Sequence, residues 1–217
     1  MSSRLPLAGE FRITCEFGKE SKRWKAGFHT GVDMVNSDKI IYSPTFGKVF
    51  RIGFDASYGN YVVIKDDTPN DEHYHWLCHL SNVTVDLNEE VTPESKVGIM
   101  GATGNATGVH LHYEIRNKLN KYGIVDNPCD YMGIPNKVGT YNEKDYQIEK
   151  DELKTLARKT NLRNMPTINS SEKTLYIEGT TLFVLEPACT EADGYVWDKV
   201  RIRVTGQEGY MINKNYR

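Results

Sequence analysis

The stretch Gly101–Arg116 contains two histidines, His110 and His112, which are close enough in the sequence to act together in a reaction. Apolar and polar residues alternate over its second half, which is typical of a strand, so His110 and His112 should share one face. Three glycines just before them indicate a tight turn with little side-chain bulk. Two imidazoles beside such a turn suit metal binding or proton transfer. The same pattern also fits an ordinary strand with two histidines on its polar face.

A second candidate pair lies upstream, where His29 and Asp33 are four residues apart. Gly31 and the β-branched neighbours disfavour a helix, whereas this spacing keeps both groups on one face of a strand or bend. A neutral imidazole and a carboxylate are common Zn²⁺ ligands. All six histidines fall at or before residue 112. The sequence therefore predicts that any metal centre belongs to the first half of the chain.

The segment 73–80 carries three more histidines. Strict alternation along a strand would place His73, His75 and His79 on one face, with Cys78 on the other. By this parity His75 is as good a candidate for chemistry as His79, and the residues alone leave both open.

Composition excludes several classes of function. With a net charge of −2 in 217 residues, the chain has no basic excess to follow a phosphate backbone, so no nucleic-acid partner is expected. The four cysteines form no Cys-x-x-Cys pair, which argues against a zinc ribbon and a disulfide framework. No apolar stretch is long enough for membrane insertion, and the N-terminus lacks the apolar core of a signal peptide. Synthesis in the cytoplasm is therefore expected.

Short strands separated by turn signals predict an all-β fold in two modules. The first module covers residues 1–135. A polar segment without apolar period, 136–153, is predicted to be a linker. Residues 154–217 form a second strand-rich module, of a size that folds alone only marginally.

Several motifs, in the same order, resemble those of the lysostaphin- and LytM-like zinc metallopeptidases, which cut peptidoglycan cross-bridges. The resemblance covers about residues 5–130 and implies an antiparallel β-sheet metallopeptidase domain. The matching stretches are Phe28-His-Thr-Gly-Val-Asp33, Ile41-Tyr-Ser-Pro44, Tyr58-Gly-Asn-Tyr-Val-Val-Ile64, Cys78-His-Leu-Ser81 and Thr107-Gly-Val-His-Leu-His-Tyr-Glu-Ile-Arg116.

Carried over residue by residue, the resemblance implies one catalytic Zn²⁺ per chain, held by His29, Asp33 and His112 with a water as fourth ligand. The catalytic pair would be His79 and His110, which handle protons and stabilise the oxyanion. The trailing Leu-Ser favours His79 over His75. The chain departs from the family at Leu77, where a tyrosine is usual, and at Cys78, where a small residue is usual.

The second module resembles bacterial SH3-like cell-wall-binding domains through Thr160-Asn-Leu-Arg-Asn-Met-Pro166. Its aromatic residues Tyr176, Trp197 and Tyr210 would either dock wall peptide or glycan from the surface, or form an ordinary barrel core.

These features together predict a zinc-dependent endopeptidase that hydrolyses peptide bonds in bacterial peptidoglycan, at a stem-peptide cross-link or an interpeptide bridge. Without a signal peptide, a phage endolysin is expected, released to the wall by a separate membrane-permeabilising protein. A cell-encoded lytic enzyme exported another way is the variant. A non-catalytic regulatory relative would typically lack one of the five site residues, and a pure carbohydrate-binding protein would leave all five unexplained.

Overall fold

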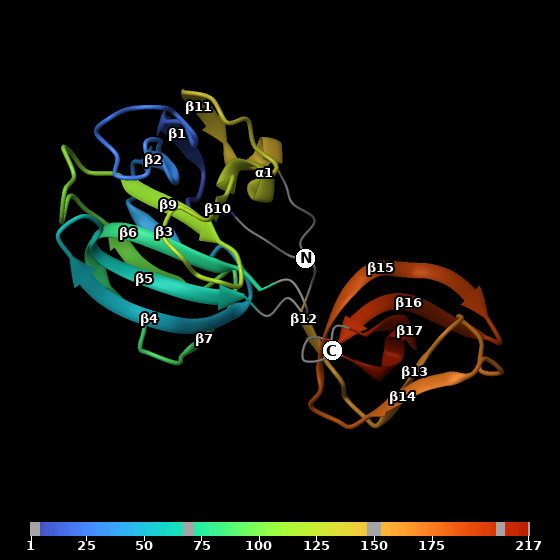
Figure 1. Ribbon diagram of the computed structural model, residues 1–217. Coiled ribbons are helices and arrows are strands. Elements are labelled where there is room, and N and C mark those ends of the chain that lie inside the picture. The colour runs from blue at the N-terminus through green and yellow to red at the C-terminus, as the bar shows by residue number, and fades with distance from the viewer. Residues whose placement is uncertain (1–4, 67–71, 147–152, 203–206, 217) are drawn as a thin grey trace. The chain divides into compact units, whose positions relative to one another are not determined.

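The computed structural model describes residues 5–66, 72–146, 153–202 and 207–216. The chain divides into two compact units, Ser2–Lys150 and Asp151–Arg217, and strands dominate both (Figure 1). All strand pairs in the described residues are antiparallel. The predicted all-β class is confirmed.

The first unit is built on one large sheet. Its main path runs β11-β1-β2-β9-β6-β5-β4-β7, while β10 pairs with β9 and β8 joins β3 to β6. The strands are β1 (Glu10–Cys15), β2 (Val32–Asn36), β3 (Ile40–Tyr42), β4 (Gly47–Asp55), β5 (Gly59–Asp66), β6 (Tyr74–Val83), β7 (Glu90–Val91), β8 (Lys96–Met100), β9 (Leu111–Arg116), β10 (Val125–Asp126) and β11 (Gly139–Asn142). A short helix, α1 (Pro128–Met132), and a 3₁₀ turn, η1 (Glu143–Tyr146), complete the unit.

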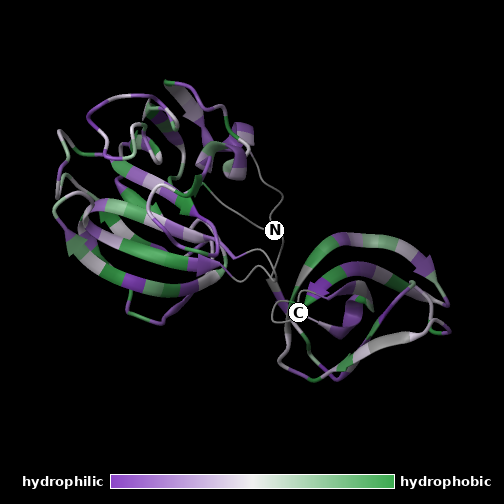
Figure 2. Ribbon diagram, in the orientation of Figure 1, coloured by the Kyte–Doolittle hydropathy of each residue, from purple (hydrophilic) through white to green (hydrophobic). Residues whose placement is uncertain are grey.

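Alternating side chains give this sheet two different faces. Figure 2 shows hydrophobic and hydrophilic residues alternating along its strands. On β9, Leu111, Tyr113 and Ile115 belong to the main hydrophobic core. The opposite face of the neighbouring strands carries a smaller apolar cluster, which contains Tyr61, Val63, Tyr74, Trp76 and Cys78. Strands β6 and β9 are therefore buried from both sides, which makes them a rigid support for polar side chains.

Part of the predicted linker belongs to the first unit. Strand β11 pairs with β1, with Tyr141 opposite Phe11, and the two rings pack at a centroid distance of 5.8 Å. The structure thus differs from the linker expected for residues 136–153, because aromatic contacts hold this polar segment against the sheet edge. Residues 147–152 of that linker lie outside the described residues.

The second unit contains a six-stranded sheet in the order β12-β15-β16-β17-β13-β14. Its strands are β12 (Leu153–Thr155), β13 (Thr160–Arg163), β14 (Glu172–Tyr176), β15 (Thr181–Ala192), β16 (Tyr195–Ile202) and β17 (Glu208–Ile212), followed by η2 (Asn213–Asn215). Tyr176 and Trp197 are buried, so for these two aromatics the core alternative holds. Tyr210 is only half-buried.

All four cysteines are free thiols. Among the described residues, no helix has the length and apolar character needed to cross a membrane.

Candidate metal centre and active site

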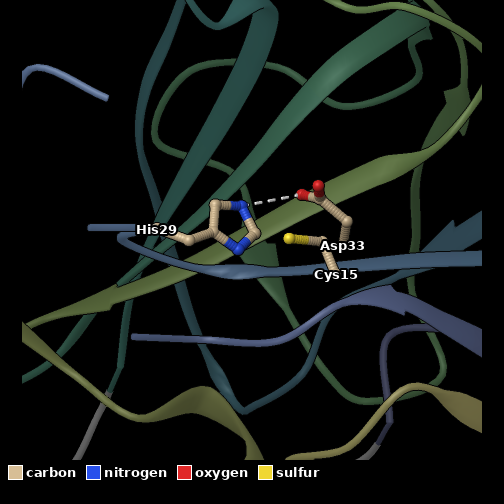
Figure 3. A group of neighbouring side chains, drawn as sticks. All are labelled: Cys15, His29 and Asp33. Carbon is tan, nitrogen blue, oxygen red and sulfur yellow. Dashed lines mark ion pairs between the residues drawn. The ribbon is translucent and has the colours of Figure 1, made fainter. Parts of the chain in front are cut away.

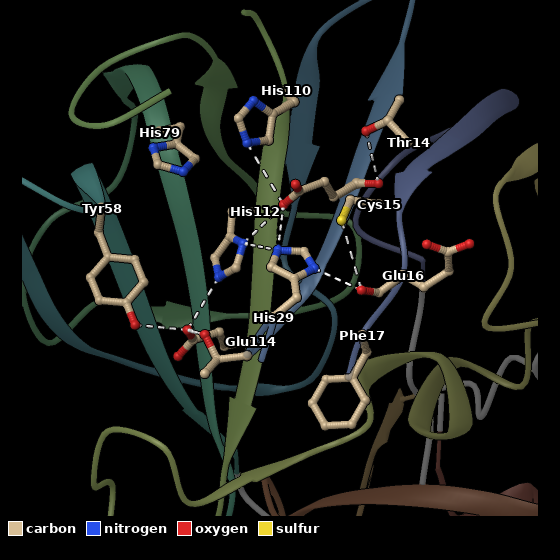
Figure 4. Close-up of polar contacts among 12 residues, drawn as sticks. Thr14, Cys15, Glu16, Phe17, His29, Tyr58, His79, His110, His112 and Glu114 are labelled. Atoms are coloured by element: carbon tan, nitrogen blue, oxygen red, sulfur yellow. Dashed lines mark hydrogen bonds and ion pairs between the residues drawn. The ribbon is translucent and has the colours of Figure 1, made fainter. Parts of the chain in front are cut away.

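Strand register brings distant polar residues together on the face of the sheet opposite the main core. Asp33 on β2 stands directly opposite His112 on β9, and His112 in turn stands opposite Cys78 on β6. His29 lies in the segment just before β2. Because facing residues on antiparallel strands have neighbouring Cβ atoms, the side chains of Asp33 and His112 meet, and His29 joins them. Figure 3 shows His29 beside Asp33, and Figure 4 shows His29 beside His112.

A glycine makes this approach possible. A Cβ atom at Gly31 would clash with the carbonyl oxygen of Tyr113 and lie 2.9 Å from the ring of His112. Any larger residue would push β2 away from β9 and separate Asp33 from His112. The glycine of the first motif is thus required by packing.

Three ligand atoms form a tight triangle that fits a zinc ion. His29 Nε2 lies 3.1 Å from Asp33 Oδ1 and 3.1 Å from His112 Nδ1, and His112 Nδ1 lies 2.9 Å from Asp33 Oδ1. Tetrahedral Zn²⁺ with bonds of about 2.0–2.1 Å places its N and O ligands about 3.3 Å apart. The two imidazoles and the carboxylate therefore match both the ligand types and the spacing of a catalytic zinc site.

The hydrogen bonds on the far side of each ring select the tautomer that a metal needs. His29 Nδ1 donates to the carbonyl oxygen of Glu16 at 2.8 Å, which leaves the lone pair of Nε2 pointing into the triangle. His112 Nε2 lies 3.1 Å from Glu114 Oε1, and donation there leaves its Nδ1 lone pair for the triangle. These are the outer partners that metal-binding histidines generally have.

Without a metal, the triangle holds protons instead. Although burial would raise it, hydrogen bonds from His112 and His29 keep the pKa of Asp33 well below its ordinary value. Burial also disfavours a charged His112, but the hydrogen bonds to Asp33 and Glu114 outweigh it and raise the pKa of His112 to about 9. A metal must displace this proton, so metal affinity should rise with pH.

His79 and His110 lie together beside the triangle, with ring centroids 4.7 Å apart. Each Nδ1 is held by a backbone carbonyl, Thr103 for His79 at 2.8 Å and Gly108 for His110 at 2.9 Å. Both Nε2 atoms are thereby left for the site, and that of His110 lies 3.7 Å from Asp33 Oδ1. Burial lowers the pKa of His79 to about 4, so this ring is neutral at pH 7.

The predicted side-chain parity of the β6 histidines is wrong. His75 points into the core, where its Nδ1 lies 2.7 Å from the hydroxyl of Tyr113 and its exposure is 0%. His79 adopts a left-handed conformation with φ 64°, and the pairing of β6 is irregular around it. This backbone reversal carries His79 to the face that bears His112. His73 contacts Asp66, away from the triangle.

Sequence reasoning overlooked the carboxylate behind His112. Glu114 is fully buried and accepts hydrogen bonds from Tyr58, Thr30 and Arg116 in addition to His112. Burial would raise its pKa, but His112 foremost, and then Arg116 and Thr30, lower the pKa to about 2. The alternation on β9 did place Glu114 on the face of His112, whereas nothing in the pattern pointed to Tyr58.

Cys15 lies beside the same triangle, and sequence analysis gave it no role. Its sulfur and one ligand atom each of His29 and Asp33 lie within 4.8 Å of one another (Figure 3). Burial and then the charge of Asp33 raise the pKa of the thiol. His112, with its nitrogen about 3 Å from both partners, is the better third ligand.

Comparison with known proteins finds similarity in the first unit. Residues 27–124 match the family model described as peptidase family M23. The peptidoglycan DD-endopeptidase ShyB of Vibrio cholerae is 31% identical over 118 residues, which are 52% of this chain and 27% of that protein. The chain spans less than a third of the length of the first curated relatives that it matches.

Two solved structures share the fold. LytU is 28% identical with a TM-score of 0.50, over 56% of this chain and 84% of that one. The antimicrobial peptidase lysostaphin from Staphylococcus simulans aligns over 93% of this chain and 87% of its own, with a TM-score of 0.51. At 20% identity that second match shows the fold alone.

Proposed function

Because residues 27–124 match the model of peptidase family M23, we propose that this protein is a zinc-dependent endopeptidase that hydrolyses peptide bonds in bacterial peptidoglycan. Its metal ligands would be His29, Asp33 and His112, and its catalytic residues His79 and His110. The observation that carries the proposal is the triangle of ligand atoms, 2.9–3.1 Å apart, together with a hydrogen-bond partner at the outer nitrogen of each imidazole, Glu16 for His29 and Glu114 for His112.

Bound Zn²⁺ would supply Lewis-acid activation of water and of the substrate carbonyl. The neutral ring of His79, anchored through Nδ1 to Thr103, presents Nε2 as a proton acceptor. His110 is anchored in the same way to Gly108, and in its protonated form its Nε2–H can donate to the oxygen on which charge develops. Two rings fixed by backbone carbonyls need little reorganisation during the reaction, which favours catalysis.

The shortage of available carboxylates at the site supports a peptide bond, and not a glycosidic bond, as the target. A glycosidase usually places two carboxyl groups on either side of the sugar linkage. Within the described part of the site, Asp33 belongs to the metal triangle and Glu114 is fully buried and hydrogen-bonded. Imidazoles beside a Lewis acid suit attack on an amide carbonyl instead.

Digestion of purified peptidoglycan tests this proposal. We expect new free amino groups and no new reducing sugar ends, with activity abolished by a chelator and restored by stoichiometric Zn²⁺. Reducing ends without amino groups would overturn the peptidase assignment. Full activity in a verified metal-free preparation would overturn the zinc assignment.

The second unit is proposed to be an SH3-like cell-wall-binding module. Its support is the six-stranded antiparallel sheet and the fold match to lysostaphin over 93% of this chain. Removing residues 151–217 should leave cleavage of soluble wall fragments intact but weaken binding to whole walls, because the second contact supplies avidity. Equal wall binding by both forms would contradict this role.

A role as a phage endolysin is the finer part of the proposal, as the sequence predicted. Among the relatives, ShyB is described as a DD-endopeptidase and ALE-1 of Staphylococcus capitis as a glycyl-glycine endopeptidase, so both a stem-peptide cross-link and a glycine bridge are candidate bonds. Mass spectrometry of the released fragments would identify the bond.

A further inference from the structure

Glu114 has a saturated set of hydrogen bonds. Its Oε1 accepts from the hydroxyl of Tyr58 at 2.7 Å, from the hydroxyl of Thr30, and from His112 Nε2 at 3.1 Å. Its Oε2 accepts from Nε of Arg116 at 2.9 Å and from the Nη2 of the same guanidinium at 2.7 Å. A carboxylate offers about four lone-pair positions, so these contacts occupy it fully. Figure 4 shows Tyr58 and His112 on either side of Glu114.

The cation that balances this charge is itself held in place. Arg116 is buried at 4% exposure, and its guanidinium lies 3.8 Å from the centroid of the Trp76 ring. Its Nη2 also donates to the hydroxyl of Tyr58 at 2.9 Å. Because Oε2 is fixed by the guanidinium, Oε1 is fixed in turn toward His112.

We propose that Glu114 is a positioning residue that holds His112 in the Nε2-protonated tautomer and so aims its Nδ1 lone pair at the metal. This inference rests on the proposed zinc site. The imidazole has only two nitrogens, and the one that donates to Glu114 cannot be the one that binds a metal. Tyr58 and Arg116 act through Glu114, because they determine where its two oxygens lie.

A single substitution of Glu114 would not separate positioning from folding. Loss of the carboxylate leaves Arg116 buried without its partner, and an unpaired buried charge is destabilising in itself. The test therefore uses an Arg116→Met background, in which an unbranched apolar side chain can remain on Trp76. In that background Glu114→Leu removes the acceptor for His112, whereas Glu114→Gln keeps a neutral acceptor of the same shape.

Zinc affinity is measured by competition with a chromogenic chelator, alongside thermal unfolding of the metal-free proteins. We expect Arg116→Met/Glu114→Leu to bind Zn²⁺ about 10- to 100-fold more weakly than wild type. Arg116→Met/Glu114→Gln should recover much of that loss, because its amide oxygen still accepts from His112. Glu72→Gln, at an exposed ion pair with Lys65, is the control and should bind as wild type does.

A second readout reports the tautomer directly. Nitrogen-15 spectra of the zinc-loaded protein should show His112 protonated at Nε2 in wild type and in the Arg116→Met/Glu114→Gln variant. Equal zinc affinity of wild type and both double variants, at similar unfolding temperatures, would overturn the inference. Wild-type protein that binds one zinc but releases no amino groups from peptidoglycan would overturn the proposed function, and leave the role of Glu114 standing.

Discussion

The sheet of the first unit carries a polar cluster on each face, and the two clusters differ in where their nitrogen lone pairs point. On one face, His29, His112 and His79 each have one ring nitrogen held by an outer partner and the other directed into a shared site. On the core face, His75 meets Tyr113 through Nδ1, and its Nε2 lies 3.8 Å from Asp66 with no hydrogen-bond partner among the described residues.

The surroundings of His79 and His75 show how a reactive histidine differs from a structural one on the same strand. Both His75 and His79 are buried, so burial does not distinguish them. His79 has neighbours that can exchange protons or hold a metal, at 4.7 Å from the ring of His110 and 5.8 Å from that of His112. His75 packs against the aromatic rings of Tyr113 and Tyr131, which offer no such chemistry.

The largest expected difference between the two faces comes from removing one carboxylate from each. Asp33→Ala should abolish zinc binding and lower turnover by more than about 10³-fold, since Lewis-acid catalysis lowers the activation barrier by several kcal/mol. Asp66→Ala, on the core face, should retain stoichiometric zinc and near-normal turnover below its unfolding temperature. Metal content by elemental analysis, together with release of amino groups, checks both. Zinc lost from the Asp66→Ala variant alone would reverse the comparison.

The two β6 histidines give the next effect when they receive the same substitution. His79→Asn keeps a residue that tolerates the left-handed backbone, and it should retain zinc while turnover falls about 10²-fold or more. His75→Asn keeps an acceptor near Nδ1 for the hydroxyl of Tyr113 and should remain within a few-fold of wild type. If His75→Asn were inactive and His79→Asn active, the functional assignment of the two faces would be wrong.

These two residues also mark how far the sequence could be interpreted. Alternation correctly put His110, His112 and Glu114 on one face of β9, because that strand is regular. The same rule failed at His79, because its left-handed backbone breaks the alternation there and Leu80 falls in the main core. Motif order favoured His79 over His75, but no local pattern predicts positive φ at a histidine. The hydrogen bond between His79 and the carbonyl oxygen of Thr103 joins a strand to a loop, and the sequence could not predict it either.

At other positions, tertiary contacts determined the structure, and the local sequence led to a wrong prediction. The polar segment around Tyr141 has no apolar period, yet it forms β11 because its aromatic ring packs on Phe11. Strict alternation put Cys78 on the face away from His79, yet Cys78 stands opposite His112 on the site face, whereas Leu77 lies in the main core. Both residues follow the regular part of β6, so the error came from using His79 as the reference for parity.

A smaller effect is expected from removing the hydroxyl of Tyr113, which contacts His75 on the core face. Tyr113→Phe leaves Nδ1 of His75 without its partner at zero exposure, and should lower the free energy of unfolding by about 1–3 kcal/mol. Zinc affinity and turnover should not change, because the hydroxyl lies on the opposite side of β9 from His112. Urea unfolding of the metal-free proteins measures the first effect. A weakened zinc site in this variant would show that the two faces are coupled through β9.

The smallest effect is a difference in pH dependence between wild type and His75→Asn. Burial lowers the pKa of His75, opposed by its interaction with Asp66, so the folded protein holds this ring neutral. Below the unfolded pKa of about 6.5 the unfolded chain takes up a proton that the folded chain does not, and stability falls as the pH decreases, by at most about 1.4 kcal/mol per pH unit.

Asp66 contributes in the same direction but at lower pH. Its pKa is depressed, against the effect of burial, by contacts with His73 and His75, so its stabilisation is present above about pH 4 and is lost on further acidification. Between pH 7.5 and 5, His75 should therefore dominate the difference between the two proteins. Protons in the metal triangle titrate equally in both and cancel in the difference. The unfolding free energies of wild type and His75→Asn should converge as the pH falls through this window. Parallel curves would contradict this, because they would show that His75 takes up its proton in the folded core as readily as in the unfolded chain.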